Sequence, residues 1–414
     1  MTAWSPIWKV NLDGVEYTNA VLANLTIRSG RTNIYEQAQA GYANLQLLDV
    51  DQAIIPVQIN SAITISVQNS AGTYVNIFGG NVVDIGLEVA NVGSTAFTQT
   101  YSITALGALA RLPKALTNGV LSKDFDGDQI YTILQQVLFA TWGQVPPAET
   151  WASYDPTTTW ATAGNTGLGE IDQPGNYELA ARTSSRTDIY SLVSALATSG
   201  LGYIYEDSQG RIGYADSTHR TVYLAANGYV DLDANHARAA GLRTDTRVGD
   251  VRNSMTIKYG ATSSSEQSAS DADSKALYGE LAQIITTTLH NSSDALAQAN
   301  FYLALRKQPQ PNFSAITFDL TNPEIDNSDR DNLIACFMGE PIRIQNLPVN
   351  MGAIFQGFIE GWSFQASYNR LAVSLFLSPL AYSLQAMRYK DVPIGESYAS
   401  VSPTLQWQYA TIVA

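Results

Sequence analysis

The residues that could carry out catalysis are few and lie far apart in the sequence. His219, His236 and His290 show neither HxH nor HxxxH spacing, and none has a neighbouring cysteine. Because a zinc site needs three or four ligands that converge on one point, we expect hydrogen-bonded or exposed polar histidines. GxSxG, HExxH, phosphate-loop and dinucleotide fingerprints are missing from the sequence. We therefore expect no catalytic residue, no metal site and no cofactor, although 37 acidic residues leave a glycosidase-like carboxylate pair open.

An alternating run of acids, Asp124, Asp126 and Asp128 in KDFDGDQI, resembles the start of a calcium-binding loop. An EF-hand loop places its glycine later and ends in a bidentate glutamate, whereas a helical pattern begins here at Ile130. Carboxylates at a helix N-terminus stabilise the helix by about 0.3 to 1 kcal/mol through capping and the helix dipole. The run is therefore interpreted as a helix start, with calcium binding as the alternative.

The stretch SGRTNIYEQAQAGYANLQLLD, residues 29 to 49, contains two glycines, an arginine and several amides. A phosphate-binding loop should lead into a helix, but Gly41 leads into alternating apolar and polar residues, which is a strand pattern. We expect Gly30 and Gly41 to allow a turn or bulge, and the amides between them to bond a neighbouring strand or subunit. Arg31 is a candidate interaction residue, and Arg31→Glu is expected to weaken assembly.

Three tryptophans are further candidates for contacts. Trp151 and Trp160 lie in a loop rich in Pro, Thr and Gly over residues 143 to 177. They could form a platform for a sugar, but large aromatic residues more often anchor a long loop on its own domain or on a partner. Trp407 is an isolated aromatic residue near the end of the chain.

The composition favours an assembly component over a protein that grips nucleic acid. Charged residues make up 14% of the 414-residue chain, against about 25% in ordinary domains. The formal net charge is −14, whereas nucleic-acid binding relies on Lys and Arg that neutralise phosphates. A surface past which DNA slides remains compatible with this charge.

Cysteine use and hydropathy predict a cytoplasmic product. The single cysteine, Cys336, permits no internal disulfide and lies in the apolar run LIACFMG, so we expect a buried thiol. The start MTAWSPIWKV has no signal-peptide pattern, and no apolar stretch reaches about 18 residues. We expect no membrane segment.

The pattern of elements predicts a mainly β, α+β fold in four regions. These are a first β domain (1–112), a mixed α+β middle domain (113–248), a second β domain with a helical insertion (249–385) and an extended C-terminal arm (386–414). Expected helices follow Asp126, span 187–198 with Gly200 as the cap, and span 293–307, where Leu296, Ala299 and Leu303 share a face. Expected strands include a hairpin over 63–78, a strand over 83–89 with one buried face, and a hairpin over 203–214. The Ser- and Asp-rich segment 263–274 is expected to be a mobile loop.

Two parts of the sequence resemble a known family. SGRTNIYEQAQAGYANLQLLD, followed by NIFGGNVVDIGLEV and YSITALGALARL, resembles the opening domain of tail hub proteins of long-tailed, siphovirus-like bacteriophages. NSMTIKYG, the helix from Asp294 to Arg306, LPVNMGAIFQGFIEGWSF and LAVSLFLSPL resemble the closing part of minor tail proteins from phages of actinobacteria. The resemblance covers residues 10 to 385 and is weak across 113 to 248.

The resemblance implies a structural, non-enzymatic virion protein at the distal end of the tail. Each subunit of such hubs carries two domains similar to the tail-tube subunit, of β-barrel or sandwich type, so a homotrimer presents a pseudo-hexameric ring. The implied partners are the distal tail protein ring, the tape measure protein and fibre or tip proteins, with DNA only passing through the lumen. This sequence departs from hubs with an appended peptidase or muramidase, because it ends shortly after the last expected strand. A tail-associated cell-wall or glycan hydrolase and a receptor- or carbohydrate-binding module are the alternatives.

Overall fold

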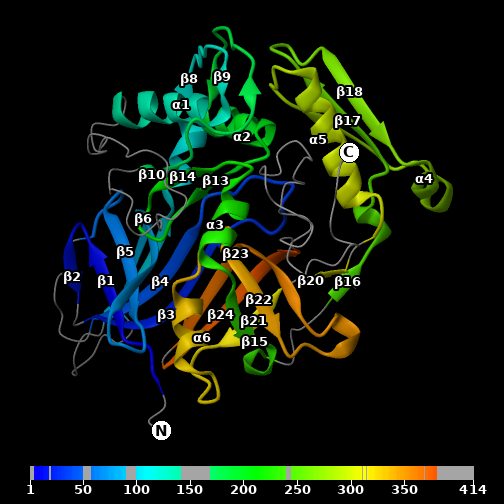
Figure 1. Cartoon of the computed structure of the whole chain (residues 1–414). Helices are drawn as coiled ribbons and strands as arrows, with labels where there is room; N and C mark the ends of the chain where they lie inside the picture. The colour runs from blue at the N-terminus through cyan, green and yellow to red at the C-terminus, as the bar shows by residue number, and fades with distance from the viewer. Residues whose placement is uncertain are drawn as a thin grey trace, which may run out of the picture.

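The computed structural model describes residues 4–17, 20–49, 57–89, 99–140, 168–238, 244–309, 311–313, 315–367 and 369–379 (Figure 1). Trp151, Trp160, Trp407 and the expected C-terminal arm lie outside these residues. The fold is mainly β with helices, which confirms the predicted α+β class. No helix in the described ranges is both long enough and apolar enough to cross a membrane.

A single large sheet runs through the molecule and contains strands from both ends of the chain. Its order is β15-β22-β23-β3-β4-β7-β6-β5-β1-β2, and β24 and β21 continue from the other side of β23. The strands near the N-terminus are β1 (Trp8–Leu12), β2 (Val15–Tyr17), β3 (Ala20–Gly30), β4 (Tyr42–Asp49), β5 (Ala62–Gln68), β6 (Tyr74–Val89) and β7 (Gln99–Leu106). The later strands are β15 (Val230–Asp233), β21 (Ile316–Asp319), β22 (Pro341–Gln345), β23 (Phe355–Ser367) and β24 (Arg370–Pro379).

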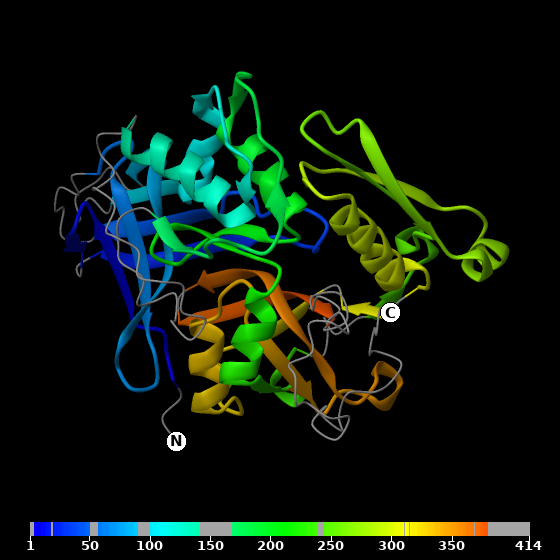
Figure 2. The same cartoon turned by 45° about the horizontal axis from the view of Figure 1, so that its top comes forward.

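The two groups of strands join where β3 pairs with β23. This antiparallel ladder runs from Gly30 opposite Gly361 to Asn24 opposite Ser367. In Figure 2 the blue strands of the N-terminal group and the orange strands of the C-terminal group meet along this line. We call this ladder the seam. Because backbone hydrogen bonds cross it, the first and last β regions form one continuous sheet.

The strands of the first region form where apolar and polar residues alternate in the sequence. Leu45 and Leu47 on β4 are buried against Ile103 on β7, as the alternation over residues 43 to 47 predicts. The expected hairpin over 63–78 is confirmed as β5 and β6, with Ile63 and Ile65 buried.

The expected buried face of the strand over 83–89 is wrong in part. The residues do form the second half of β6, but Val83, Leu87 and Val89 are 40%, 57% and 40% exposed. A register shift follows Val82, and the pairing of β6 with β5 ends at Asn81. Beyond that point β7 is the only paired neighbour of β6 among the described strands, and these three apolar side chains stay about half-exposed.

The middle region places two helices over a small sheet. The elements are η1 (Ala108–Lys114), α1 (Asp126–Ala140), β10 (Leu168–Ile171), α2 (Ile189–Ser199), β13 (Tyr203–Glu206), β14 (Ile212–Ala215) and α3 (His219–Asn227), with the short strands β8 (Leu116–Thr117), β9 (Asp124–Phe125), β11 (Glu178–Leu179) and β12 (Thr187–Asp188). The expected hairpin over 203–214 is confirmed as β13 and β14. The second expected helix is α2, which Asp188 caps by accepting a hydrogen bond from Ser191 N and which ends at Gly200. The sequence patterns used above did not predict α3.

A third unit stands to one side of the large sheet (Figures 1 and 2). It consists of β17 (Ser254–Tyr259), β18 (Ser265–Ser270), α4 (Ala272–Tyr278), β19 (Ala282–Thr286) and α5 (Ser292–Arg306), in the sheet order β18-β17-β19. The remaining elements are η3 (Ala234–His236), β16 (Thr244–Thr246), η5 (Val248–Asp250), β20 (Pro311–Phe313), α6 (Asn327–Ile334) and η6 (Val349–Met351).

Two expectations for this unit are corrected. The segment expected to be a mobile loop forms β18, which pairs with β17 over six residue pairs, and begins α4, which Asp271 caps. Pairing with a neighbouring strand outweighs the loop-like composition, because strand preference depends on context. The third expected helix is α5, but Leu296 is 41% exposed while Ala299 and Leu303 are buried.

The first prediction concerns the turn that ends β3. Gly30 has a φ of +81°, and a Cβ there would lie 2.4 Å from the carbonyl oxygen of Glu360. Gly72 has a φ of +80° but open space around it, so it is a matched control. We expect Gly72→Ala to cost about 1 kcal/mol of unfolding free energy through backbone strain. Gly30→Ala should cost a further 1 kcal/mol or more, roughly, because it also overpacks the seam. Equal losses in urea unfolding would contradict this account of the seam.

Candidate functional site

The centre of the candidate site is Glu360, a fully buried carboxylate in the middle of β23. The pairing of β23 with β24 shifts register between Ile359 and Gly361, so Glu360 occupies a β-bulge. The bulge lies where the neighbour of β23 changes from β22, paired through Phe358, to β3, paired from Gly361. The carboxylate therefore sits at the end of the seam.

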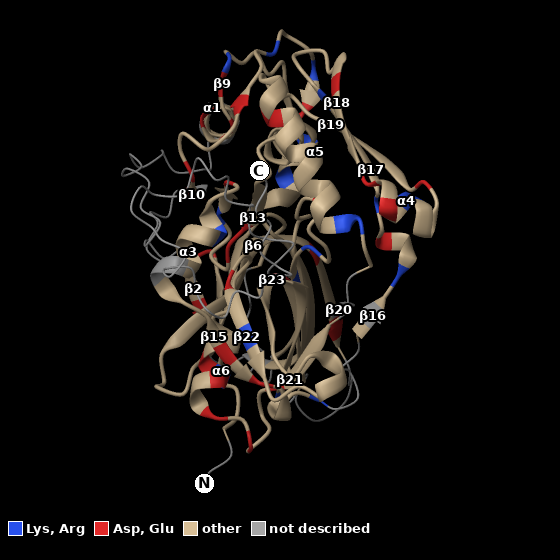
Figure 3. Cartoon of the chain, turned by 45° about the vertical axis from the view of Figure 1, so that its right-hand side comes forward, with Lys and Arg blue, Asp and Glu red and all other residues tan. Residues whose placement is uncertain are grey.

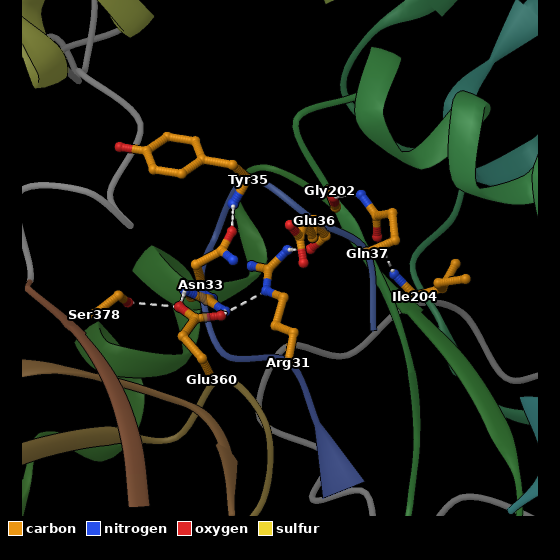
Figure 4. Close-up of polar contacts among 10 residues, drawn as sticks. Arg31, Asn33, Tyr35, Glu36, Gln37, Gly202, Ile204, Glu360 and Ser378 are labelled. Carbon is orange, nitrogen blue, oxygen red and sulfur yellow. Dashed lines mark hydrogen bonds and ion pairs between the residues drawn. The ribbon is translucent and has the colours of Figure 1, made fainter. Parts of the chain in front are cut away.

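Two arginines and a serine bind the Glu360 carboxylate. Figure 4 shows the contacts of Arg31 and Ser378 with it. Arg31 Nε donates to Oε2 at 2.7 Å, and Arg220 donates from Nη1 to Oε1 at 2.6 Å and from Nη2 to Oε2 at 3.0 Å. Ser378 Oγ donates to Oε1 at 2.5 Å. Arg31 directly follows β3, Arg220 is in α3, and Ser378 is near the end of β24. The ion cluster Arg31–Glu360–Arg220 thus joins the first, middle and last regions of the chain.

Aromatic rings complete the surroundings of the ion cluster. The Tyr203 ring lies 5.2 Å from the Arg31 guanidinium carbon and 4.5 Å from that of Arg220. Phe358 lies 5.2 Å from Arg220 on the same measure. Cations near aromatic rings are attracted by the ring quadrupole, most strongly where water is excluded.

The charges of the ion cluster shift one another's proton affinities. Burial alone would raise the pKa of Glu360, but Arg220 and Arg31 overcome this and lower the pKa to about 2. Burial lowers the pKa of Arg31, although Glu360 opposes the shift. Glu360 is consequently ionised over the whole neutral range.

The loop between β3 and β4 is attached to the middle region by its amides. The Gln37 side chain donates from Nε2 to Gly202 O at 3.1 Å and accepts from Ile204 N at 3.0 Å (Figure 4). The side-chain amide of Gln37 thereby donates and accepts hydrogen bonds at β13 as the backbone of a neighbouring strand would. This confirms, within the chain, the expectation that amides between the two glycines bond a strand.

The two glycines of this loop serve different purposes. Gly30 takes the left-handed backbone at the end of β3. Gly41 is needed for close approach, because its N–H donates to the Glu206 carboxylate and a Cβ would collide with that group. Glu206 also accepts from Leu109 N at 3.1 Å. Burial raises the pKa of Glu206 to about 7, which these hydrogen bonds only partly offset.

Two histidines pair with carboxylates, which agrees with the expectation of hydrogen-bonded histidines. His219 Nδ1 lies 2.8 Å from Asp172 Oδ2, and His236 Nδ1 lies 2.8 Å from Asp329 Oδ2. With Glu170 and Asp326 respectively, these pairs form groups whose nitrogen and oxygen atoms lie within 4.8 Å of one another. Such donor sets could hold a divalent cation, but the pairs also have a sufficient explanation as buried or half-buried ion pairs. The third histidine, His290, is exposed.

The acidic run marks the start of α1, as its sequence was interpreted, and one of its carboxylates has a further role. Asp126 and Asp128 do lie in the first turn of α1, as expected of a helix start. The Asp126 carboxylate, however, is fully buried and accepts from Asn176 N at 2.8 Å, Tyr177 N at 2.7 Å and the Tyr214 hydroxyl. Burial raises its pKa to about 7. The three aspartates do not form a convergent donor group among the described residues.

Of the four candidate contact residues, only Arg31 is described, and its side chain points inward. It is 8% exposed and bound to Glu360. Arg31→Glu would place a second carboxylate beside Glu360, so weaker assembly in that variant would not by itself identify a subunit contact. Cys336 is 6% exposed, which confirms the expected buried thiol.

Sequence reasoning missed Glu360 and Arg220. The available signal was a lone glutamate in the apolar strand GFIEGWSF, directly before a glycine. A charge inside a buried strand demands a partner. Its partners lie 329 and 140 residues away, however, and no local pattern identifies them.

Comparison with known proteins supports a fold shared with phage tail proteins. The fold is similar to the tail protein from Neisseria meningitidis MC58, with a TM-score of 0.59 and 12% identity over 92% of this chain and 98% of that one. It is also similar to the 43 kDa tail protein of prophage MuSo2 from Shewanella oneidensis, with a TM-score of 0.54 and 14% identity over 90% of this chain and 100% of that one. No protein-family model matches the sequence, and no curated protein matches it. At these identities the likeness establishes the fold.

The second prediction tests the ion cluster. Glu360→Gln leaves two buried guanidiniums without a counter-charge, and we expect it to cost about 3 to 5 kcal/mol of unfolding free energy. The matched control is Asp231→Asn, which breaks the half-exposed pair of Asp231 with Arg343 between β15 and β22. Exposed pairs contribute about 0 to 1 kcal/mol, so the control should be nearly neutral. Similar denaturant midpoints for the two variants would refute the importance of the ion cluster.

Proposed function

We propose that this chain is a structural protein of a phage tail and forms the central hub of the tail tip. The observation that carries the proposal is the similarity in fold, over about nine-tenths of the chain, to two tail proteins. The hub assignment is finer than that similarity and rests also on the family resemblance of residues 10 to 385. In this proposal the protein is located in the virion, at the distal end of the tail.

A homotrimer would explain the arrangement of the strands. The proposed domains are 1–112, 113–248 and 249–385, followed by the arm 386–414. If the first and third each take the place of one tube subunit, three copies supply six positions around a sixfold tube. The seam supports this idea, because it fixes the two β groups in one sheet and would hold their spacing constant. The distal tail ring, the tape measure protein and fibre or tip proteins are the proposed partners.

Charge is compatible with the passage of DNA through such a ring. The net charge is −14, and in Figure 3 acidic segments appear on several elements, including α4 and α6. If part of this acidity lines the lumen, the wall would repel the DNA backbone and DNA would pass without binding. A lumen lined mostly by Lys and Arg would overturn this part of the proposal.

The proposal is tested by locating the chain in an intact particle. Cryo-electron microscopy of the tail, with this protein identified by density and by mass spectrometry, should find three copies in a ring at the distal end. One copy, six copies or a position in the tube wall would contradict the hub. Zymography of the purified protein on cell walls tests the alternative that the protein is a hydrolase. A cleared band would show an activity that a structural hub does not require.

A further inference from the structure

Two carboxylates and an imidazole converge at the carboxyl end of the small sheet in the middle region. Glu170 is in β10, Asp172 directly follows that strand, and His219 is the first residue of α3. One nitrogen or oxygen atom from each residue lies within 4.8 Å of those from the other two. We call these three residues the donor cluster. The spacing of residues in the sequence did not predict it, because Asp172 and His219 are 47 positions apart.

Backbone pairing brings the two segments of the donor cluster together. β10 and β14 are parallel, with Ile171 opposite Tyr214, and Asp172 N donates to Tyr214 O at 3.1 Å. The carboxyl ends of the two strands therefore lie side by side. Asp216, just after β14, donates from its backbone nitrogen to Asp172 Oδ2 at 2.9 Å. The Asp172 carboxylate is thus fixed beside the segment that leads into α3.

The second oxygen of Asp172 is the observation that points to a ligand. The residue is 1% exposed. Its Oδ2 accepts from Asp216 N and lies 2.8 Å from His219 Nδ1. Its Oδ1 is also buried, but it has no hydrogen-bond partner among the described residues. Buried acceptors are nearly always bonded. The ion pair with His219 accounts for Oδ2 and leaves Oδ1 available to a positive ligand.

The contact of His219 with Asp172 also fits two ligands of one ion. A neutral imidazole with its proton on Nε2 presents a lone pair at Nδ1, which would repel a carboxylate oxygen 2.8 Å away unless a cation bridges them. Two ligands at right angles, each about 2.1 Å from a metal ion, lie about 3.0 Å apart. Burial lowers the pKa of His219, but Asp172, Glu170 and Asp216 outweigh burial and raise it. The electric field at the donor cluster therefore favours positive charge.

We propose that the donor cluster binds a divalent transition-metal ion through carboxylate oxygens of Glu170 and Asp172 and through Nδ1 of His219. Zn²⁺ and Mn²⁺ bind such mixed oxygen and nitrogen donors, whereas Ca²⁺ takes about six to eight oxygens. The ion would fasten the start of α3 to the end of β10. Since Arg220 follows His219 and binds Glu360, the ion would also help to position this arginine. This inference stands without the proposed function.

Equilibrium dialysis of the full chain, treated with EDTA and then held with Zn²⁺, Mn²⁺ or Ca²⁺, tests the proposal, with bound metal measured by mass spectrometry. We expect one Zn²⁺ per chain and weaker binding of Mn²⁺ and Ca²⁺. Zn²⁺ should raise the unfolding temperature, because an ion that binds only the folded state stabilises it. Its affinity should fall as the pH is lowered, since a proton competes for Nδ1. No bound Zn²⁺, Ca²⁺ bound more tightly than Zn²⁺, or an adventitious ion only, bound without a rise in unfolding temperature, would overturn the proposal.

Two matched variants locate the ion. Asp172→Asn and Asp329→Asn each remove a carboxylate whose oxygen lies 2.8 Å from a histidine Nδ1. Asp172→Asn should weaken Zn²⁺ binding by about tenfold or more, and Asp329→Asn should leave it unchanged. If Asp172→Asn fails to fold, Glu170→Gln is expected to weaken Zn²⁺ binding in the same way. Loss of binding in Asp329→Asn alone, or equal binding by all variants, would place the ion elsewhere and contradict the assignment.

Discussion

The constraint on which the rest of the structure depends is the burial of Glu360 at a bulge in β23. An ionised carboxylate removed from water is very unfavourable unless it is paired and fully hydrogen-bonded. Here the pairing groups come from the end of β3, from α3 and from β24. The carboxylate therefore cannot be satisfied until all three parts of the chain are in place. This makes the formation of the seam cooperative with the docking of the middle region.

Net stabilisation is not the strongest reason for such an ion cluster. Replacing a buried ion pair by hydrophobic residues often leaves the free energy of unfolding unchanged or raises it. The best-supported role of buried charges is to fix the register of neighbouring elements. A one-residue slip along a sheet exchanges its two faces. At the seam a slip would also break the hydrogen bond of 2.8 Å from Arg31 N to the carbonyl oxygen of Glu360. It would separate Arg31 Nε from the Glu360 carboxylate as well. The ion cluster thus selects a single alignment of two strands that are far apart in sequence.

Local patterns predicted much of the fold, and the failures have a common cause. The strands around Leu45 and Ile65 and the helix from Ile189 were predictable because periodicity and burial agree there. The exposure of Leu87 and the strand at Ser265–Ser270 depend on which strand lies alongside, which a local pattern does not contain. The same limit hid the ion cluster: Arg31 was singled out by its place between glycines, but its partners were not. The hydrogen bonds of Gln37 are the exception. They could be expected from the sequence, because an amide beside a turn has to bond a group close to that turn.

Hydrogen exchange measured by mass spectrometry tests most directly whether the seam unites the two groups of strands. The central claim is that β3 and β23 separate only when the sheet as a whole unfolds. Amides of residues 24–30 and 361–367 should then show the same high protection as those of β4 and β24, the strands on either side of them. Faster exchange at the seam than in β4 and β24 would mean that the two groups move independently, which would contradict the claim.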